Sequence, residues 1–148
     1  MLKVLVPVDG SAHADRAVAE VLDLAAHGAE LEIHLLNVQV PIDSGHARMF
    51  VSREAVEAYH REEGLAALAN ARRMLDQAGI AHAHHIAVGH VVDTIVRYAG
   101  ERGFDKIVMG THGRGGLLGA LLGSVARDVV KRAGIPVMLV KPDAPPAP

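Results

Sequence analysis

The fold class is indicated first by the opening residues Leu2-Lys3-Val4-Leu5-Val6-Pro7-Val8-Asp9-Gly10-Ser11. From Leu2 to Val8 it is rich in β-formers and apolar on both faces, which is typical of a central parallel strand covered by helices on both sides. A helical pattern follows over Ala14–Ala26, with Ser11 as the expected N-cap and Gly28 as the expected end. The opening therefore predicts a strand that leads directly into a covering helix.

The same alternation continues along the chain. The predicted strands are Leu2–Val8, Leu31–Val38, Ala83–Val88, Asp105–Gly110 and Ile135–Val140. The predicted helices are Ala14–Ala26, Ser52 to about Gln77, a third around Val92–Ala99, and Ser124–Arg132. Such alternation predicts an α/β fold with a doubly wound five-stranded parallel sheet and helices on both faces. Gly64 inside the long helix costs about 1 kcal/mol relative to alanine, so a bend or break is expected there.

The domain organisation follows from length and composition. The chain has 148 residues, which fits one domain, and we place that domain at residues 1–141. Pro41–Phe50 has no clear period and is expected to be a mobile surface loop. Pro142–Pro148 is too rich in proline to pack, so a disordered tail is expected.

Composition argues against several functional classes. The formal net charge is −2 and no block of lysine or arginine stands out, so no nucleic-acid partner is expected. No apolar run approaches the roughly 20 residues that a spanning helix needs, so no membrane insertion is expected. Cysteine is absent, which excludes disulfides and thiolate metal sites and fits a cytoplasmic protein.

Unusual residues follow two of the predicted strands. Asp9-Gly10-Ser11 follows the first strand, and Gly110-Thr111-His112-Gly113-Arg114-Gly115-Gly116 ends the fourth. Ligands of doubly wound sheets bind beyond the carboxyl ends of the strands, where the winding direction reverses. If both segments face one crevice, the first and fourth strands are neighbours. That favours the strand order 3-2-1-4-5 over 2-1-3-4-5.

A cluster of six glycines lies between Gly110 and Gly123, just before the predicted helix that begins at Ser124. Glycine is entropically costly, so a cluster indicates positive φ angles or a backbone that closely approaches a ligand. A helix N-terminus offers free N–H groups to anions, and Arg114 could add a two-pronged contact to a phosphate. The segment has neither the GxxxxGK[ST] pattern nor a GxGxxG after the first strand. On the residues alone, an anion site and a flexible connection both stay open.

The pattern Gly110-x2-Gly113-x9-Gly123-Ser124 resembles the ATP-binding motif of the universal stress protein family. Val6–Ser11 is similar to the opening of that family, and Gly123–Val140 to its end. The resemblance covers nearly the whole chain, excluding Pro41–Phe50 and the tail.

The resemblance implies a site for ATP, with ADP or AMP as alternatives, and a Mg²⁺ ion bound together with the nucleotide. Asp9 would contact the ribose or lie near the adenine side, and Val38 would hold adenine through its backbone. Met109 and Gly110 would line the nucleoside, while phosphates would contact Gly113, Arg114, Gly123 and Ser124. The complete predicted set is Pro7, Asp9, Ser11, Val38, Met109, Gly110, Gly113, Arg114, Gly123, Ser124 and Val125.

The expected activity is nucleotide-dependent regulation of a stress response. Fast catalysis is not expected, because no base or carboxylate pair stands out. Slow Mg²⁺-dependent ATP hydrolysis and a nucleotide-free interaction module are the alternatives. The last strand is apolar on both faces at a sheet edge, and Val137–Val140 of a second copy would cover it in a homodimer.

Histidines are the other candidates for a site. His82 and His84 share a face of one strand, but two histidines without a carboxylate make a weak metal site, so a surface or packing role is expected. His112 could donate to an anion or act in acid–base chemistry, but it is expected to point to solvent or to pack on a neighbouring loop.

Overall fold

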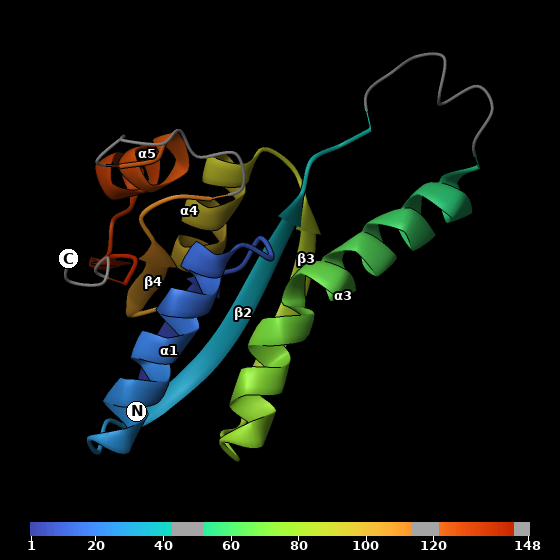
Figure 1. Ribbon diagram of the computed structural model, residues 1–148. Coiled ribbons are helices and arrows are strands. Elements are labelled where there is room, and N and C mark those ends of the chain that lie inside the picture. Colours follow the sequence, from blue (N-terminus) through green and yellow to red (C-terminus); the bar gives the residue numbers. More distant parts are fainter. Residues whose placement is uncertain (43–51, 114–121, 144–148) are drawn as a thin grey trace, which may run out of the picture.

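The computed structural model describes residues 1–42, 52–113 and 122–143. Five parallel strands form one sheet in the order β3-β2-β1-β4-β5, which confirms the predicted order (Figure 1). The strands are β1 (Leu2–Pro7), β2 (Leu31–Gln39), β3 (His82–Val88), β4 (Lys106–Gly110) and β5 (Val137–Val140). The helices of these ranges are α1 (Ala12–Ala26), α3 (Arg53–Gln77), α4 (Val91–Glu101) and α5 (Ser124–Arg132).

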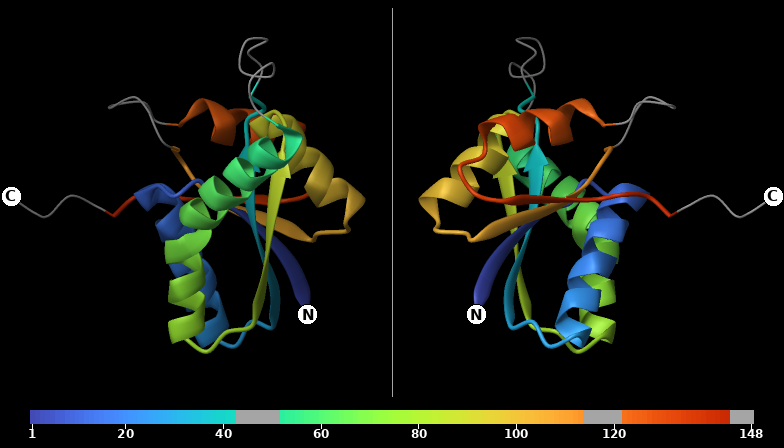
Figure 2. Two further views of the ribbon diagram at one scale, coloured as in Figure 1. Left: turned by 90° about the vertical axis from the view of Figure 1, so that its right-hand side faces the viewer. Right: turned by 90° about the vertical axis from the view of Figure 1, so that its left-hand side faces the viewer.

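Helices cover both faces of the sheet, as predicted. Helices α1 and α3 lie on one face and α4 on the other (Figure 2). Side chains alternate along each strand, so neighbouring residues enter different cores. Val4, Val6 and Leu35 pack under α1 and α3, whereas Leu5 and Leu36 pack under α4 and α5.

Local signals explain where helix α1 begins and ends. Ser11 is its N-cap, and the Ser11 hydroxyl accepts a hydrogen bond from the Ala14 N–H at 3.3 Å. Gly28 follows the C-cap with φ at +96°, a conformation that favours glycine. Both sequence signals for this helix are therefore confirmed.

A bend or a break was expected at Gly64 in helix α3, and the helix differs from one of these two expectations. The predicted break is wrong, because the helix runs without interruption from Arg53 to Gln77, although it bends along its length in Figure 1. Gly64 is buried where the helix meets β3, and a Cβ atom there would lie 2.7 Å from Ile86 Cδ1. Glycine therefore permits the helix to approach the sheet closely.

Most of the expected loop Pro41–Phe50 and of the expected tail Pro142–Pro148 lies outside the described residues. Within the described ranges, Arg16 Nε on α1 lies 3.3 Å from Asp143 Oδ1. The chain just beyond β5 is therefore joined to α1 by an ion pair.

Candidate functional site

The loop after β1 carries Asp9 at the carboxyl edge of the sheet. Asp9 Oδ1 accepts a hydrogen bond from the Ser11 N–H at 2.9 Å, which fixes the carboxylate against the first turn of α1. Gly10 between them has φ at +85°, and a Cβ atom there would lie 3.4 Å from the Ala67 Cα on α3. Glycine is thus required for this turn, and the turn places the other carboxylate oxygen of Asp9 toward β4.

The loop after β4 meets that carboxylate. A Cβ atom at Gly113 would lie 2.7 Å from Asp9 Oδ2, so Gly113 is small because Asp9 lies against it. A Cβ atom at Gly110 would lie 2.6 Å from the His13 backbone oxygen on α1. The Gly123 N–H donates to the Thr111 carbonyl at 2.7 Å, which joins the two ends of the glycine-rich segment. Gly110 and Gly123 therefore allow close approaches between backbone segments, and Gly113 allows the Asp9 side chain to approach.

A cavity of about 380 Å³ opens where these loops meet. Seven of the predicted residues line it: Pro7, Asp9, Val38, Met109, Gly110, Gly113 and Val125. The sequence also predicted Ser11, Gly123 and Ser124, which are not among the lining residues, and Arg114, which lies outside the described residues. The volume falls within the roughly 300–1,000 Å³ of small-molecule sites, and the lining is mostly apolar.

The helix α5 begins beside the cavity. Its N-cap is Gly123, which makes no side-chain capping bond, and Ser124 is the exposed first residue. The first N–H groups of a helix lack partners within that helix and favour anions. Gly123 and Ser124 thus lie at the N-terminus of α5, next to the lining residue Val125.

Sequence reasoning missed Asn37, which is 3% exposed and lines the cavity. Its Nδ2 donates to the Val8 carbonyl at 2.8 Å, and its Oδ1 accepts from Gln39 Nε2 at 2.7 Å. These bonds hold the end of β1, and therefore Asp9, against β2. An asparagine within the apolar run of the second strand was the available signal. Val91 and Ile95 of α4 also line the cavity and were not predicted.

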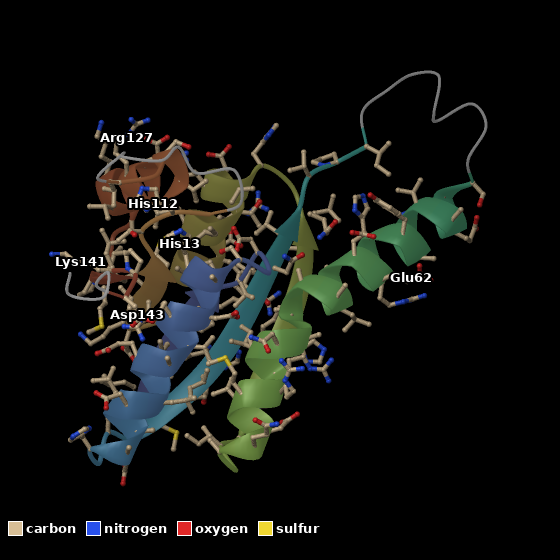
Figure 3. The ribbon with its side chains drawn as sticks, viewed as in Figure 1. His13, Glu62, His112, Arg127, Lys141 and Asp143 are labelled. Carbon is tan, nitrogen blue, oxygen red and sulfur yellow. The ribbon has the colours of Figure 1, made fainter. Side chains whose placement is uncertain are left out.

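His112 lies at the cavity rather than in solvent. It is half-buried, lines the cavity and packs against His13, with 5.2 Å between ring centroids (Figure 3). Its Nδ1 is 3.0 Å from the Thr111 hydroxyl. His112 therefore packs on helix α1 and not on a neighbouring loop, and the alternative that it contacts an anion stays a prediction.

The model of the universal stress protein family matches residues 1–141. This chain belongs to the universal stress protein family. Universal stress protein MJ0531 of Methanocaldococcus jannaschii is 32% identical over 94% of this chain and 81% of its own length. Universal stress protein YxiE of Bacillus subtilis is also 32% identical, over 94% of this chain and 98% of its own.

Solved structures of other universal stress proteins share the fold. The structure of MJ0577 from Methanocaldococcus jannaschii superposes with a TM-score of 0.81 and 31% identity, covering 97% of this chain and 98% of that one. The described strand order and helix arrangement are thus those of the family.

This universal stress protein carries a second polar cluster on the α4 side of the sheet, below the cavity. His34 of β2 and His85 of β3 are joined through Nδ1 and Nε2 at 2.8 Å. Their planes differ by 7° and their centroids are 5.1 Å apart, so the rings meet edge to edge in a hydrogen bond. Glu32 Oε2 lies 2.8 Å from His34 Nε2. Because an ionised carboxylate only accepts, His34 Nε2 carries a proton, and in the neutral pair His34 Nδ1 accepts from His85.

Aromatic rings and cations surround this histidine pair. Tyr98 of α4 packs on His85 with 5.3 Å between centroids, and Phe104 lies edge-on to His34 at 5.1 Å. Arg102 lies 4.2 Å from the Tyr98 ring centroid. Burial lowers the pKa of His85, and the charges of His34, Arg102, His84 and Lys3 lower it further.

A metal role for the histidines of β3 finds no support in the geometry. His82 and His84 lie on the α3 side, where His82 Nδ1 is 2.9 Å from the Ile80 carbonyl. Across residues 1–42, 52–113 and 122–143, no three histidine or carboxylate side chains gather as metal ligands.

None of the helices described here combines the length and apolar character needed to cross a bilayer.

Proposed function

We propose that the cavity binds an adenine nucleotide, with ATP as the first candidate and ADP or AMP as alternatives. The observation that carries this proposal is the meeting of Asp9 and Gly113 at the cavity. They come from loops after β1 and β4, the two neighbouring strands at which the winding of the sheet reverses. Ligands of doubly wound sheets bind at this position.

Solved relatives support an adenine nucleotide as the ligand class. A universal stress protein of Arabidopsis thaliana was solved with AMP bound, at 25% identity and a TM-score of 0.69 over 97% of this chain. Another was solved with cAMP, at 27% identity and a TM-score of 0.68, and one from Archaeoglobus fulgidus with dAMP, at 25% and 0.65. Adenine is common to the three ligands, whereas the phosphate arrangement and the sugar differ.

The lining suggests how each part of a nucleotide would be held. Adenine fits the apolar walls at Val38 and Met109, and ribose hydroxyls suit the Asp9 carboxylate. Phosphates suit the N-terminus of α5 at Gly123 and Ser124. Asp9 could also share a Mg²⁺ ion with the phosphates, since Mg²⁺ in such sites takes one or two carboxylates plus phosphate oxygens. Arg114 stays a predicted phosphate contact.

The protein would then act as a nucleotide-dependent regulator in the stress response. Binding a ligand to the folded state stabilises that state and can change what the surface presents to a partner. Asn37 links the cavity to the end of β1, and α4 provides the wall at Val91 and Ile95. A ligand bound in the cavity would therefore act first on these elements.

Substitution of Gly113 tests this function. A valine at Gly113 would occupy the space of the Asp9 carboxylate and the mouth of the cavity. The φ angle of Gly113 is not positive, so valine would not strain the backbone there. Calorimetry with ATP, ADP and AMP should show binding by the native protein and a loss of tenfold or more, about 1.4 kcal/mol, in Gly113→Val.

Gly134→Val is the matched control, because a Cβ atom there meets nothing within 4 Å. It should bind as the native protein does. Gly123→Val is a less clean variant, since a Cβ atom there would lie 3.1 Å from the Thr111 backbone oxygen, so the fold is strained as well. Equal nucleotide affinity in the native protein and Gly113→Val, or no binding by the native protein, would overturn the proposal.

A homodimer through β5 remains part of this proposal. Strand β5 pairs with β4 on one side and lies at the edge of the sheet, with Val137, Met138 and Leu139 half-buried. Met138→Lys would place a charge on this edge and should shift a dimer toward monomer in sedimentation. A native protein that sediments as a monomer at tens of micromolar would contradict the dimer.

A further inference from the structure

The charges around the proposed nucleotide site are unbalanced. Among the described residues that line the cavity, Asp9 is the only permanently charged one, and its charge has the same sign as a phosphate. His112 is the one described lining residue that can become positive. A nucleotide phosphate that enters this cavity therefore meets one fixed negative charge and one side chain whose charge depends on protonation.

His112 can change charge without losing the bond that orients it. Its Nδ1 is 3.0 Å from the hydroxyl of Thr111, which is 5% exposed. A hydroxyl donates to a neutral imidazole nitrogen and accepts from a protonated one, so it serves both states. A Cβ atom at Gly123 would lie 3.2 Å from the His112 Cα, which places this histidine beside the N-terminus of α5.

His13 of α1 lies against His112. The ring centroids are 5.2 Å apart with planes tilted by 44°, and His13 is not among the lining residues. Within the described ranges, its Nδ1 is buried and has no hydrogen-bond partner. His13 therefore adjoins His112 without being among the lining residues itself.

Among the described residues, the other charged groups on the neighbouring elements leave this role to His112, while Arg114 lies outside those residues and stays a predicted phosphate contact. On α1, Arg16 is paired with Asp143, and Asp15 lies in the first turn. On α5, Arg127 lies 3.3 Å from Asp128, and Lys141 after β5 is exposed; both cations point outward in Figure 3. Asp9 from the loop after β1 lines the same cavity as His112.

We propose that His112 is a phosphate contact that becomes positively charged when the nucleotide binds, so that phosphate recognition is coupled to uptake of a proton. This inference rests on the proposed nucleotide-binding function and adds a proton-linked specificity to it. The site would prefer adenine ligands that carry phosphate over adenosine, and the preference would grow as the pH falls toward neutrality. His13 adjoins the contact but does not make it.

The test is calorimetry of the full chain with AMP and with adenosine, in buffers of different ionisation enthalpy. The native protein should take up a fraction of one proton per AMP at pH 7.0 and none per adenosine. Its AMP affinity should rise from pH 8.0 to 7.0, up to the limit of about tenfold per pH unit for one linked proton. This window is chosen because a phosphate takes up its own proton near pH 6.

Three variants make the test specific. His112→Gln should abolish proton uptake and lower AMP affinity at pH 7.0, while adenosine affinity stays within twofold of native. Thr111→Val should reduce the proton uptake, because it removes the partner of Nδ1. His13→Gln should retain it. Each variant's melting temperature checks the fold.

Each outcome has a fixed meaning. AMP binding without proton uptake, or uptake that persists in His112→Gln, would overturn this inference and leave the proposed function standing. Uptake lost in His13→Gln and kept in His112→Gln would also overturn it. Failure of both AMP and adenosine to bind would overturn the inference together with the proposed function.

Discussion

The two faces of the sheet are built from the same strands but differ in how completely they are filled. Under α1 and α3, small residues permit close contact, as at Gly64 against Ile86. Under α4 and α5, Leu36 lines a cavity at the carboxyl edge, and His34 lies below it. Because side chains alternate along a strand, adjacent residues belong to different faces. A substitution at one strand position should therefore alter the packed core, whereas a substitution at the next position should alter the cavity.

The largest expected effect tests this separation at Leu35 and Leu36, which are 0% and 1% exposed. Leu35→Ala should lower the free energy of unfolding by about 2–5 kcal/mol, because it empties the packed core under α1 and α3. Nucleotide affinity, measured by calorimetry well below the melting temperature, should stay within twofold of native.

Leu36→Ala is the paired change on the cavity side. Its side chain borders the cavity, so it has fewer neighbours to lose and should cost the lower part of the same range. Nucleotide affinity should change instead. Denaturant unfolding and calorimetry on both variants make the comparison. Equal losses of affinity in Leu35→Ala and Leu36→Ala would show that the faces are not separable.

A smaller effect is expected at the glycine that brings α3 onto the sheet. Gly64→Ala should destabilise the protein by about 1–3 kcal/mol, because the added methyl group overlaps Ile86 in a packed core. The gain in helix propensity, about 1 kcal/mol, would offset only part of an overlap at 2.7 Å.

Gly100 of α4 is the matched control for Gly64. It is exposed near the end of its helix, and a Cβ atom there meets nothing within 4 Å. Gly100→Ala should therefore leave stability unchanged or raise it by up to about 1 kcal/mol. Thermal unfolding of the two variants decides the point. A stabilised Gly64→Ala would mean that α3 can move away from β3 without cost.

The same contrast explains how far the sequence predicts this molecule. Strand order followed from Asp9 and the glycine-rich segment, because residue types that are unusual in strands and helices lay at two strand ends. The role of Gly64 did not follow, since helix propensity records only the local cost of glycine and not the approach of β3. Helix propensity considers one helix alone and gives no information about the position of Ile86.

Partners across strands were equally inaccessible. His34 and His85 are 51 positions apart and meet because β2 and β3 pair with Leu36 opposite His85. Asn37 and Val8 are joined in the same way between β2 and β1. Register is set by the packed sheet, so periodicity located each strand but not these contacts. The predicted cavity residues could be identified because glycine spacing and family resemblance can both be read from the sequence alone.

The smallest expected effect concerns pH and the histidine pair that fills the lower part of the α4 face. Burial, His34 and nearby cations hold the pKa of His85 below its ordinary value. The unfolded state therefore binds this proton more readily than the folded state. The stability that His85 contributes is fully present above pH 6.5 and is lost as the pH falls through the lower folded pKa. Unfolding free energy should thus decline from pH 7.5 to 5.5, and the decline should be shallower in His85→Gln.

His27 provides a control of opposite sign at the exposed end of α1. The Asp23 backbone carbonyl bonded to its ring, and the Asp23 charge, raise the pKa of His27. Its contribution is present below pH 6.5 and is lost as the pH rises through the folded pKa. Removing it in His27→Gln should therefore make the decline toward low pH steeper, while His85→Gln makes it shallower. Denaturant titrations at four pH values distinguish the two slopes. Slopes that change in the same direction would show that burial under α4 does not set the protonation of His85.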